Sequence, residues 1–179
     1  MQLVPEAEAA QWMAGVGIGV HPRFPSNLAF VEAPDCQTSW LPTGRVCDLP
    51  GFLQTAVGLA QEHGSVWLYR KGGGSWYEDE DAPIGNQIID RVLAALGVPR
   101  DFHGALAFEF VEWRDLYLVI STFIVWGWSI GEDLYIIPAT GSCMLMTSHH
   151  GELFGLFPTE DALAKFEAEM TRLEFPGRR

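Results

Sequence analysis

The chain has 179 residues, of which 48% are hydrophobic, and a formal net charge of −12. A chain of this length can form one domain that buries about 70% of the surface its unfolded form exposes. Nucleic acids and anionic membrane surfaces both bind clustered lysine and arginine, so the acidic balance disfavours both as partners. The same charge would attract a basic protein.

Cysteine usage and the N-terminus favour a cytoplasmic protein. The three cysteines, Cys36, Cys47 and Cys143, contain no CxxC pair and cannot all form disulfides, which suits a reducing compartment. No basic residue precedes Arg23, so we expect no signal peptide. The longest apolar run, 116–128, is shorter than the roughly 17–25 residues of a membrane span, so we expect it in a core.

Residues 1–63 form the less regular part of the chain. The stretch "PEAEAAQWMAG" predicts a short helix that opens at Pro5 and ends near Gly15. Segments rich in glycine and proline follow, which indicate irregular chain with one or two short strands. "GFLQTAVGLAQEHG" then predicts a helix that stops at Gly64.

Clearer signals begin at residue 65. "SVWLYR" predicts a strand, and "KGGGSWY" reads as a glycine turn that returns into a second strand. A helix is predicted from its apolar stripe, with Asp81 as a possible cap and Gly97 after its end. The stripe consists of Ile88, Ile89, Val92, Leu93 and Leu96.

The second half alternates strands and helices. "ALAFEFVEW" predicts a strand, and "LYLVISTFIVWGW" is ambiguous between strand and buried helix, of which we favour the helix. "DLYIIP", "SCMLMTS" and "ELFGLF" predict an antiparallel meander. A final helix follows with Thr159 as its N-cap. We therefore expect one α+β domain over residues 1–179, an antiparallel sheet packed by four to five helices in a single layer on one face.

Two adjacent histidines, His149 and His150, stand before Gly151. Neighbouring side chains on a strand point to opposite faces, so such a pair seldom binds one metal. We interpret the stretch as a hairpin tip. The alternative is a pocket in which one of these histidines works beside Ser142 and Glu152, as in a small-ligand-binding protein or a hydrolase-like enzyme.

Other chemical motifs are weak. The glycines at 72–74 do not follow the GxxxxGK[ST] pattern of a phosphate loop, and Ser142 and Cys143 are not part of a GxSxG elbow. Aromatic residues such as Tyr117 and Tyr135 could line a pocket, although at this density they are more often core. We expect no metal and no cofactor, and a non-catalytic role is favoured over an enzyme.

The acidic run Glu78, Asp79, Glu80 and Asp81 is either a solvated loop or a contact surface for a basic protein. Consecutive acids project in different directions, so a calcium loop is not expected. If the run is a contact surface, the preceding Trp76 and Tyr77 are candidate anchors, because interface hot spots favour Trp and Tyr.

The stretch "EDLYIIPATGSCMLMTSHHGELFGLFPTEDALAKFEAEMTRLEFP", about a quarter of the chain, resembles the closing part of small bacterial proteins of the toxin-immunity type. The resemblance implies a binding protein that neutralises a partner toxin. It implies no catalytic residues for this chain. An acidic inhibitor suits a basic toxin through electrostatic complementarity.

Overall fold

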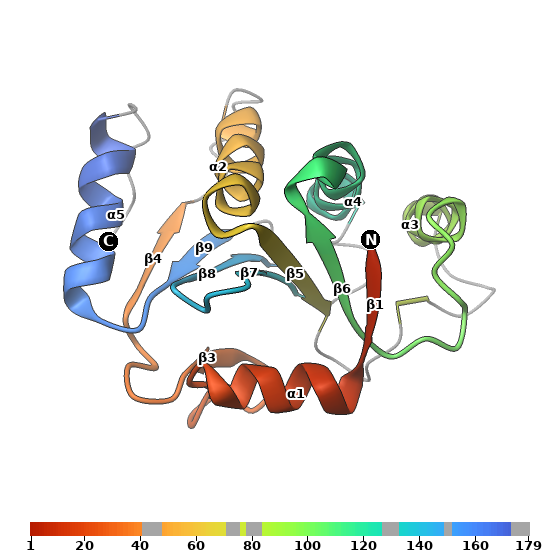
Figure 1. Ribbon diagram of the computed structural model, residues 1–179. Coiled ribbons are helices and arrows are strands. Elements are labelled where there is room, and N and C mark those ends of the chain that lie inside the picture. Colours follow the sequence, from red (N-terminus) through yellow and green to blue (C-terminus); the bar gives the residue numbers. More distant parts are fainter. Residues whose placement is uncertain (41–47, 71–75, 78–83, 127–132, 149–151, 173–179) are drawn as a thin grey trace.

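A computed structural model of the chain describes residues 1–40, 48–70, 76–77, 84–126, 133–148 and 152–172. Within these ranges the chain forms a seven-stranded sheet, a separate two-stranded sheet and five α-helices (Figure 1). The expected α+β class is confirmed.

The strands are short: β1 Gln2–Pro5, β2 Ile18–Val20, β3 Leu28–Phe30, β4 Gln37–Trp40, β5 Ser65–Arg70, β6 Gly104–Glu109, β7 Leu134–Pro138, β8 Met144–Thr147 and β9 Leu153–Leu156. The helices are α1 Glu6–Gly15, α2 Asp48–His63, α3 Ile84–Ala95, α4 Trp113–Trp126 and α5 Glu160–Arg172, and a 3-10 turn, η1 Phe110–Glu112, stands directly before α4.

The large sheet has the order β1-β6-β5-β7-β8-β9-β4, and every neighbouring pair is antiparallel. Strands β7, β8 and β9 are neighbours in sequence and in space, which confirms the predicted meander. The predicted return strand after β5 is wrong, because β5 pairs with β6 and β7 while Trp76 and Tyr77 form a bend. The glycines at 72–74 lie outside the described residues.

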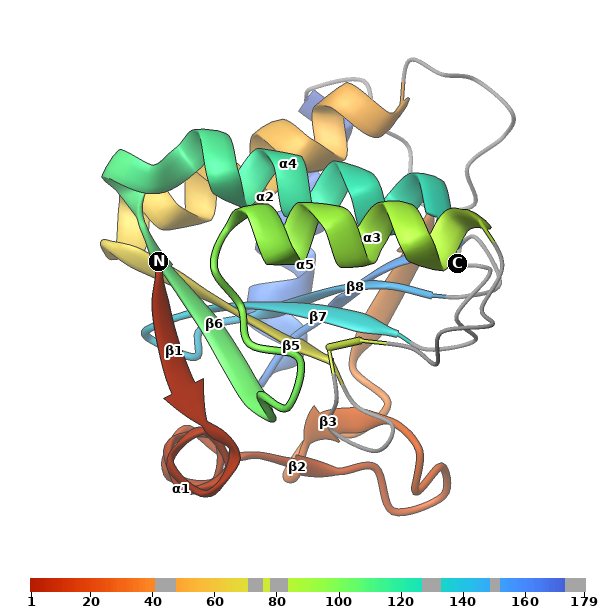
Figure 2. The ribbon, with the colours of Figure 1, turned by 90° about the vertical axis from the view of Figure 1, so that its right-hand side faces the viewer.

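Helices cover both faces of the sheet. Figures 1 and 2 show α2, α3 and α4 side by side over one face, with α5 on the same side near β4. Helix α1 and the β2–β3 ribbon cover the opposite face. The expected layer of helices on one face is therefore present, but a further helix, α1, lies on the other face. Strand β6 accordingly buries Leu106 and Phe108 toward one layer and Ala105 and Ala107 toward the other.

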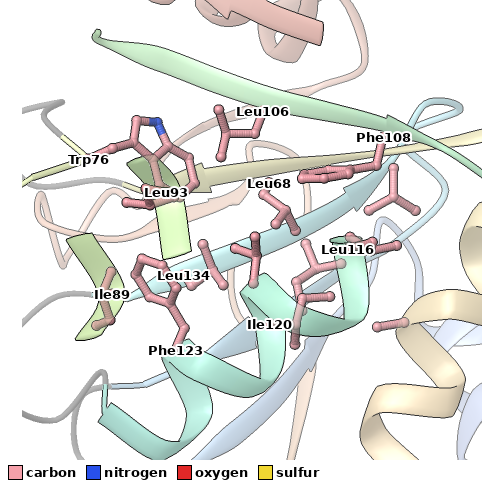
Figure 3. Packing of buried hydrophobic residues seen from close by; sticks show 14 of the residues in the cluster. Leu68, Trp76, Ile89, Leu93, Leu106, Phe108, Leu116, Ile120, Phe123 and Leu134 are labelled. Carbon is pink, nitrogen blue, oxygen red and sulfur yellow. The ribbon is translucent and has the colours of Figure 1, made fainter. Parts of the chain in front are cut away.

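The larger core lies between the sheet and the layer of α2, α3 and α4 (Figure 3). Helix α4 contributes Leu116, Ile120 and Phe123, which repeat at helical spacing and are almost fully buried. The helical interpretation of the ambiguous apolar run is therefore confirmed as far as Trp126.

Two predicted helix ends and one predicted helix cap are confirmed. Gly64 and Gly97 follow α2 and α3 with φ of 83° and 80°, a region that favours glycine. The Thr159 hydroxyl accepts a hydrogen bond from the Ala162 N–H at 3.2 Å and caps α5. The first 63 residues hold more strand than expected, because β1 and β4 form both edges of the large sheet.

Candidate functional site

The predicted acidic contact run, Glu78 to Asp81, lies outside the described residues. Its two proposed anchors are described, and both are buried. The Trp76 indole Nε1 donates to the Gly104 carbonyl at 2.9 Å, and the Tyr77 hydroxyl donates to the Val98 carbonyl at 2.6 Å. Trp76 and Tyr77 therefore belong to the core. Their prediction as contact anchors is wrong, because both side chains are buried and their polar tips are hydrogen-bonded internally.

The predicted alternative pocket does not assemble from its described members. His149 and His150 lie outside the described residues. The Glu152 backbone carbonyl accepts a hydrogen bond from the Ser148 N–H at 2.8 Å, between the end of β8 and the start of β9. Ser142 precedes β8 at the opposite end, so at least the length of a four-residue strand, about 13 Å, separates it from Glu152. The grouping of Ser142 with Glu152 is wrong.

Ser142 instead meets a histidine that the sequence did not single out. His63, the last residue of α2, places its Nε2 3.5 Å from the Ser142 Oγ and its Nδ1 3.2 Å from the Thr140 Oγ1. The two hydroxyl oxygens are only 3.1 Å apart. If each oxygen lay along the hydrogen-bonding direction of its own ring nitrogen, the two would be roughly 8 Å apart. At most one of them can be aligned.

The carboxylate of Glu62, beside His63, does not complete a catalytic relay. Glu62 Oε2 lies 3.8 Å from the same His63 Nε2 that faces Ser142. A serine–histidine–acid relay needs the acid on the other nitrogen, where it fixes the tautomer. The group of His63, Thr140 and Ser142 is thus a polar surface contact between α2 and the β7–β8 turn, without the geometry of an activated nucleophile.

The neighbouring thiol, that of Cys143, is buried. Burial raises the pKa of the Cys143 thiol to about 12, and a hydrogen bond with Ser142 opposes this shift. Since the thiolate is the reactive form, a thiol with this pKa is a poor nucleophile near neutral pH. Cys143 packs with Cys36 and Phe157 in a small cluster under α5, as its apolar sequence context predicted.

The most unusual surface of the described chain lies on α4 and the turn before it. Five large apolar side chains there are between 41% and 80% exposed. We call them the α4 face: Val111, Trp113, Tyr117, Leu118 and Val125. Exposed large apolar side chains that gather on one element are candidates for an interaction site.

The α4 face follows from the composition of the helix. Four of the five buried residues of α4 are apolar, Thr122 being the exception, and several of its exposed residues are apolar too, so the helix is apolar around most of its circumference. Figure 2 shows α4 flanked by α2 and α3, which cover its two sides and leave the outward side open. The one cation on this side, among the described residues of α4, is Arg114, whose guanidinium carbon lies 5.4 Å from the Trp113 ring centroid.

An open groove of about 420 Å³ runs between α2 and α4 beside the α4 face. The two helices meet where β5 begins and β6 ends: α2 ends just before Ser65, which pairs with Glu109 just before the turn into α4. The helices therefore run antiparallel. Six residues line the groove: Gln54, Val57, Gly58, Gln61, Trp113 and Tyr117.

The start of α4 is fixed by polar contacts. Glu109 and Glu112 form a capping box, in which the Glu109 N–H donates to the Glu112 carboxylate at 3.0 Å. The same carboxylate pairs with the N-terminal ammonium of Met1. These contacts hold Trp113 at the head of the helix, and hence at one end of the groove.

The sequence contained a signal for this surface that was interpreted differently. The run 116–128 is the longest apolar run of the chain, and the sequence predicts that all of it lies in the core. Tyr135 is fully buried, as expected, but Tyr117 is 41% exposed. The sequence prediction places Trp113 at the end of a strand. It therefore does not show that Trp113 and Tyr117 stand four residues apart on one side of a helix.

Comparison with protein-family models, with curated proteins and with solved structures finds no match to this chain. In the part of the chain that the structure describes, no three His, Cys, Asp or Glu side chains are grouped so that they could bind a metal ion. No helix among the described residues is long and apolar enough to cross a membrane.

Proposed function

We propose that this chain is a non-catalytic, acidic protein-binding module of the immunity type, which neutralises a basic partner toxin by covering it. The observation that carries the proposal is the α4 face. Trp and Tyr are the residue types that most often contribute binding energy at interfaces, and Trp113 and Tyr117 stand one helical turn apart on this surface.

The proposed partner is basic because of the charge of the whole chain. A net charge of −12 creates a field that accelerates association with a cationic surface and is screened by salt. The same charge disfavours a second copy of this chain as the occupant, because two chains of −12 repel each other.

The test uses, one at a time, the purified products of the reading frames that adjoin this chain's own. Association and dissociation rates are measured by biolayer interferometry at about 50 and about 300 mM salt. We expect one basic product to bind, with an association rate that falls at the higher salt. The double variant Trp113→Ala with Leu118→Ser should weaken this binding by about 100-fold, mainly through faster dissociation.

Phe24→Ala is the matched control. Phe24 is 55% exposed and lies in the loop of the β2–β3 ribbon, which covers the opposite face of the sheet. It should leave the binding unchanged. Binding that is independent of salt, or that Phe24→Ala weakens as much as the double variant does, would contradict the proposal.

A further inference from the structure

Gly58 lies in the interior of α2, where glycine costs stability. Glycine in a helix interior is less favourable than alanine by about 1 kcal/mol, because its backbone loses more freedom on folding. Such a residue usually has a reason in the fold, either a positive φ or a close neighbour that leaves no room for a side chain.

Neither reason applies to Gly58. The glycines with positive φ in the described chain are Gly17, Gly64, Gly97, Gly104 and Gly141. A Cβ atom built at Gly58 would meet nothing within 4 Å. The space in front of this residue is the groove between α2 and α4. Gly58 thus keeps the groove open at a cost to the helix.

The shape of the groove suits side chains carried by another helix. From Gln54 to Gln61 it extends along two turns of α2, about 10 Å. An amphipathic helix that docks between two antiparallel helices presents side chains at the same spacing. A pocket for a small molecule encloses most of its ligand, whereas Trp113 and Tyr117 in the wall of this groove are each more than 40% exposed.

We infer that the groove between α2 and α4 receives one basic amphipathic helix of the partner, and that the missing side chain of Gly58 is what allows the helix to approach. The inference rests on the proposed function, because the net charge of −12 selects a basic occupant. The apolar side of the helix would contact Val57, Trp113 and Tyr117. Gln54 and Gln61 would accept or donate hydrogen bonds at the rim.

The probe is a designed, fluorescein-labelled peptide of 14 residues, with leucine at positions 4, 7 and 11 and lysine or arginine on the opposite side. A scrambled peptide of identical composition carries the same charge without the leucine stripe. Binding to the full chain is measured by fluorescence anisotropy. We expect the patterned peptide to bind at least about tenfold more tightly than the scrambled one.

Gly58→Leu fills the groove from within, and Gly15→Leu is its matched control. Gly15 is the last residue of α1, on the other side of the sheet, and a Cβ atom there also meets nothing within 4 Å. Gly58→Leu should weaken binding of the patterned peptide by about tenfold or more, because its side chain fills the groove. It should also raise the melting temperature of the protein, because glycine is removed from a helix interior. Gly15→Leu should leave the affinity unchanged.

Two outcomes would overturn the inference: equal binding of the two peptides, or wild-type affinity in Gly58→Leu. In another outcome, a basic protein partner binds through the α4 face while Gly58→Leu changes the binding of neither this partner nor the patterned peptide. That result would support the proposed function and contradict the docking of a helix in the groove. If the peptide binds as expected but no basic protein partner is found, the groove does receive a basic amphipathic helix and the proposed function is contradicted.

Discussion

Thr38 shows what burial of a single hydroxyl costs. It lies on the edge strand β4, is only 4% exposed, and its Oγ1 has no hydrogen-bond partner among the described residues. Its neighbour across the strand pair is Gly155, which offers no side chain. A buried hydroxyl without a partner loses its bonds to water and gains nothing in return.

Thr38→Val should therefore stabilise the protein. Valine keeps the branched shape and removes the unsatisfied oxygen, so we expect the free energy of unfolding in urea to rise by about 1 kcal/mol. Thr122→Val is the control, because the Thr122 hydroxyl is buried but donates to the Leu118 carbonyl at 2.7 Å. That variant should gain nothing, and equal gains in both would contradict the explanation.

Cys143 predicts a loss of stability at alkaline pH. In the unfolded chain its thiol loses a proton near pH 9, while burial raises the folded pKa to about 12. Between these values the folded state binds more protons than the unfolded state, so stability falls as pH rises. The urea midpoint should drop between pH 9 and pH 11, and it should drop less in Cys143→Ala. The same drop in both proteins would show that this thiol does not contribute.

Among the elements, β1 depends on a single glycine of its partner strand. Gly104 has a φ of 141°, and a Cβ atom there would lie 2.0 Å from the Val4 carbonyl oxygen and 2.8 Å from the Glu6 nitrogen. Both neighbours are backbone atoms at the junction of β1 and α1, so neither can move without displacing an element. The Gly104 carbonyl also accepts the Trp76 indole N–H.

Gly104→Ala should accordingly destabilise the protein by about 3 kcal/mol, through the strained φ and the overlap with β1. The urea midpoint measures this change, and hydrogen exchange at Leu3 and Val4 should show whether β1 detaches. Gly15→Ala, where the added methyl group meets nothing, should cost far less. A Gly104→Ala protein as stable as the wild type would show that β1 contributes little to the fold.

At the scale of the molecule, the described residues expose large apolar side chains on both sides of the sheet. The β2–β3 side exposes Val20, Phe24 and Val31, but there the Arg23 guanidinium pairs with Asp35 beside them. The α4 face has five such side chains, and its two aromatic residues, Trp113 and Tyr117, line the groove. Under the proposed function, a net charge of −12 would accelerate the encounter with a basic partner, and the apolar α4 face would slow its dissociation.

Much of the local structure could be predicted. The stripe of α3, the cap of α5 by Thr159 and the meander of β7 to β9 were visible, because each depends on residues close together in the chain. Strand β1 was missed, because its partner β6 lies about a hundred residues away and four residues carry little periodicity.

The candidate site could not be predicted in the same way. The aromatic residues that seemed suited to a contact surface, Trp76 and Tyr77, are buried, while Trp113 and Tyr117 are exposed. Hydrophobic pattern fixes that a side chain is apolar and on which side of its helix it stands. Only the packing of α2 and α3 beside α4 decides which of its sides are covered, because those contacts join residues far apart in the chain.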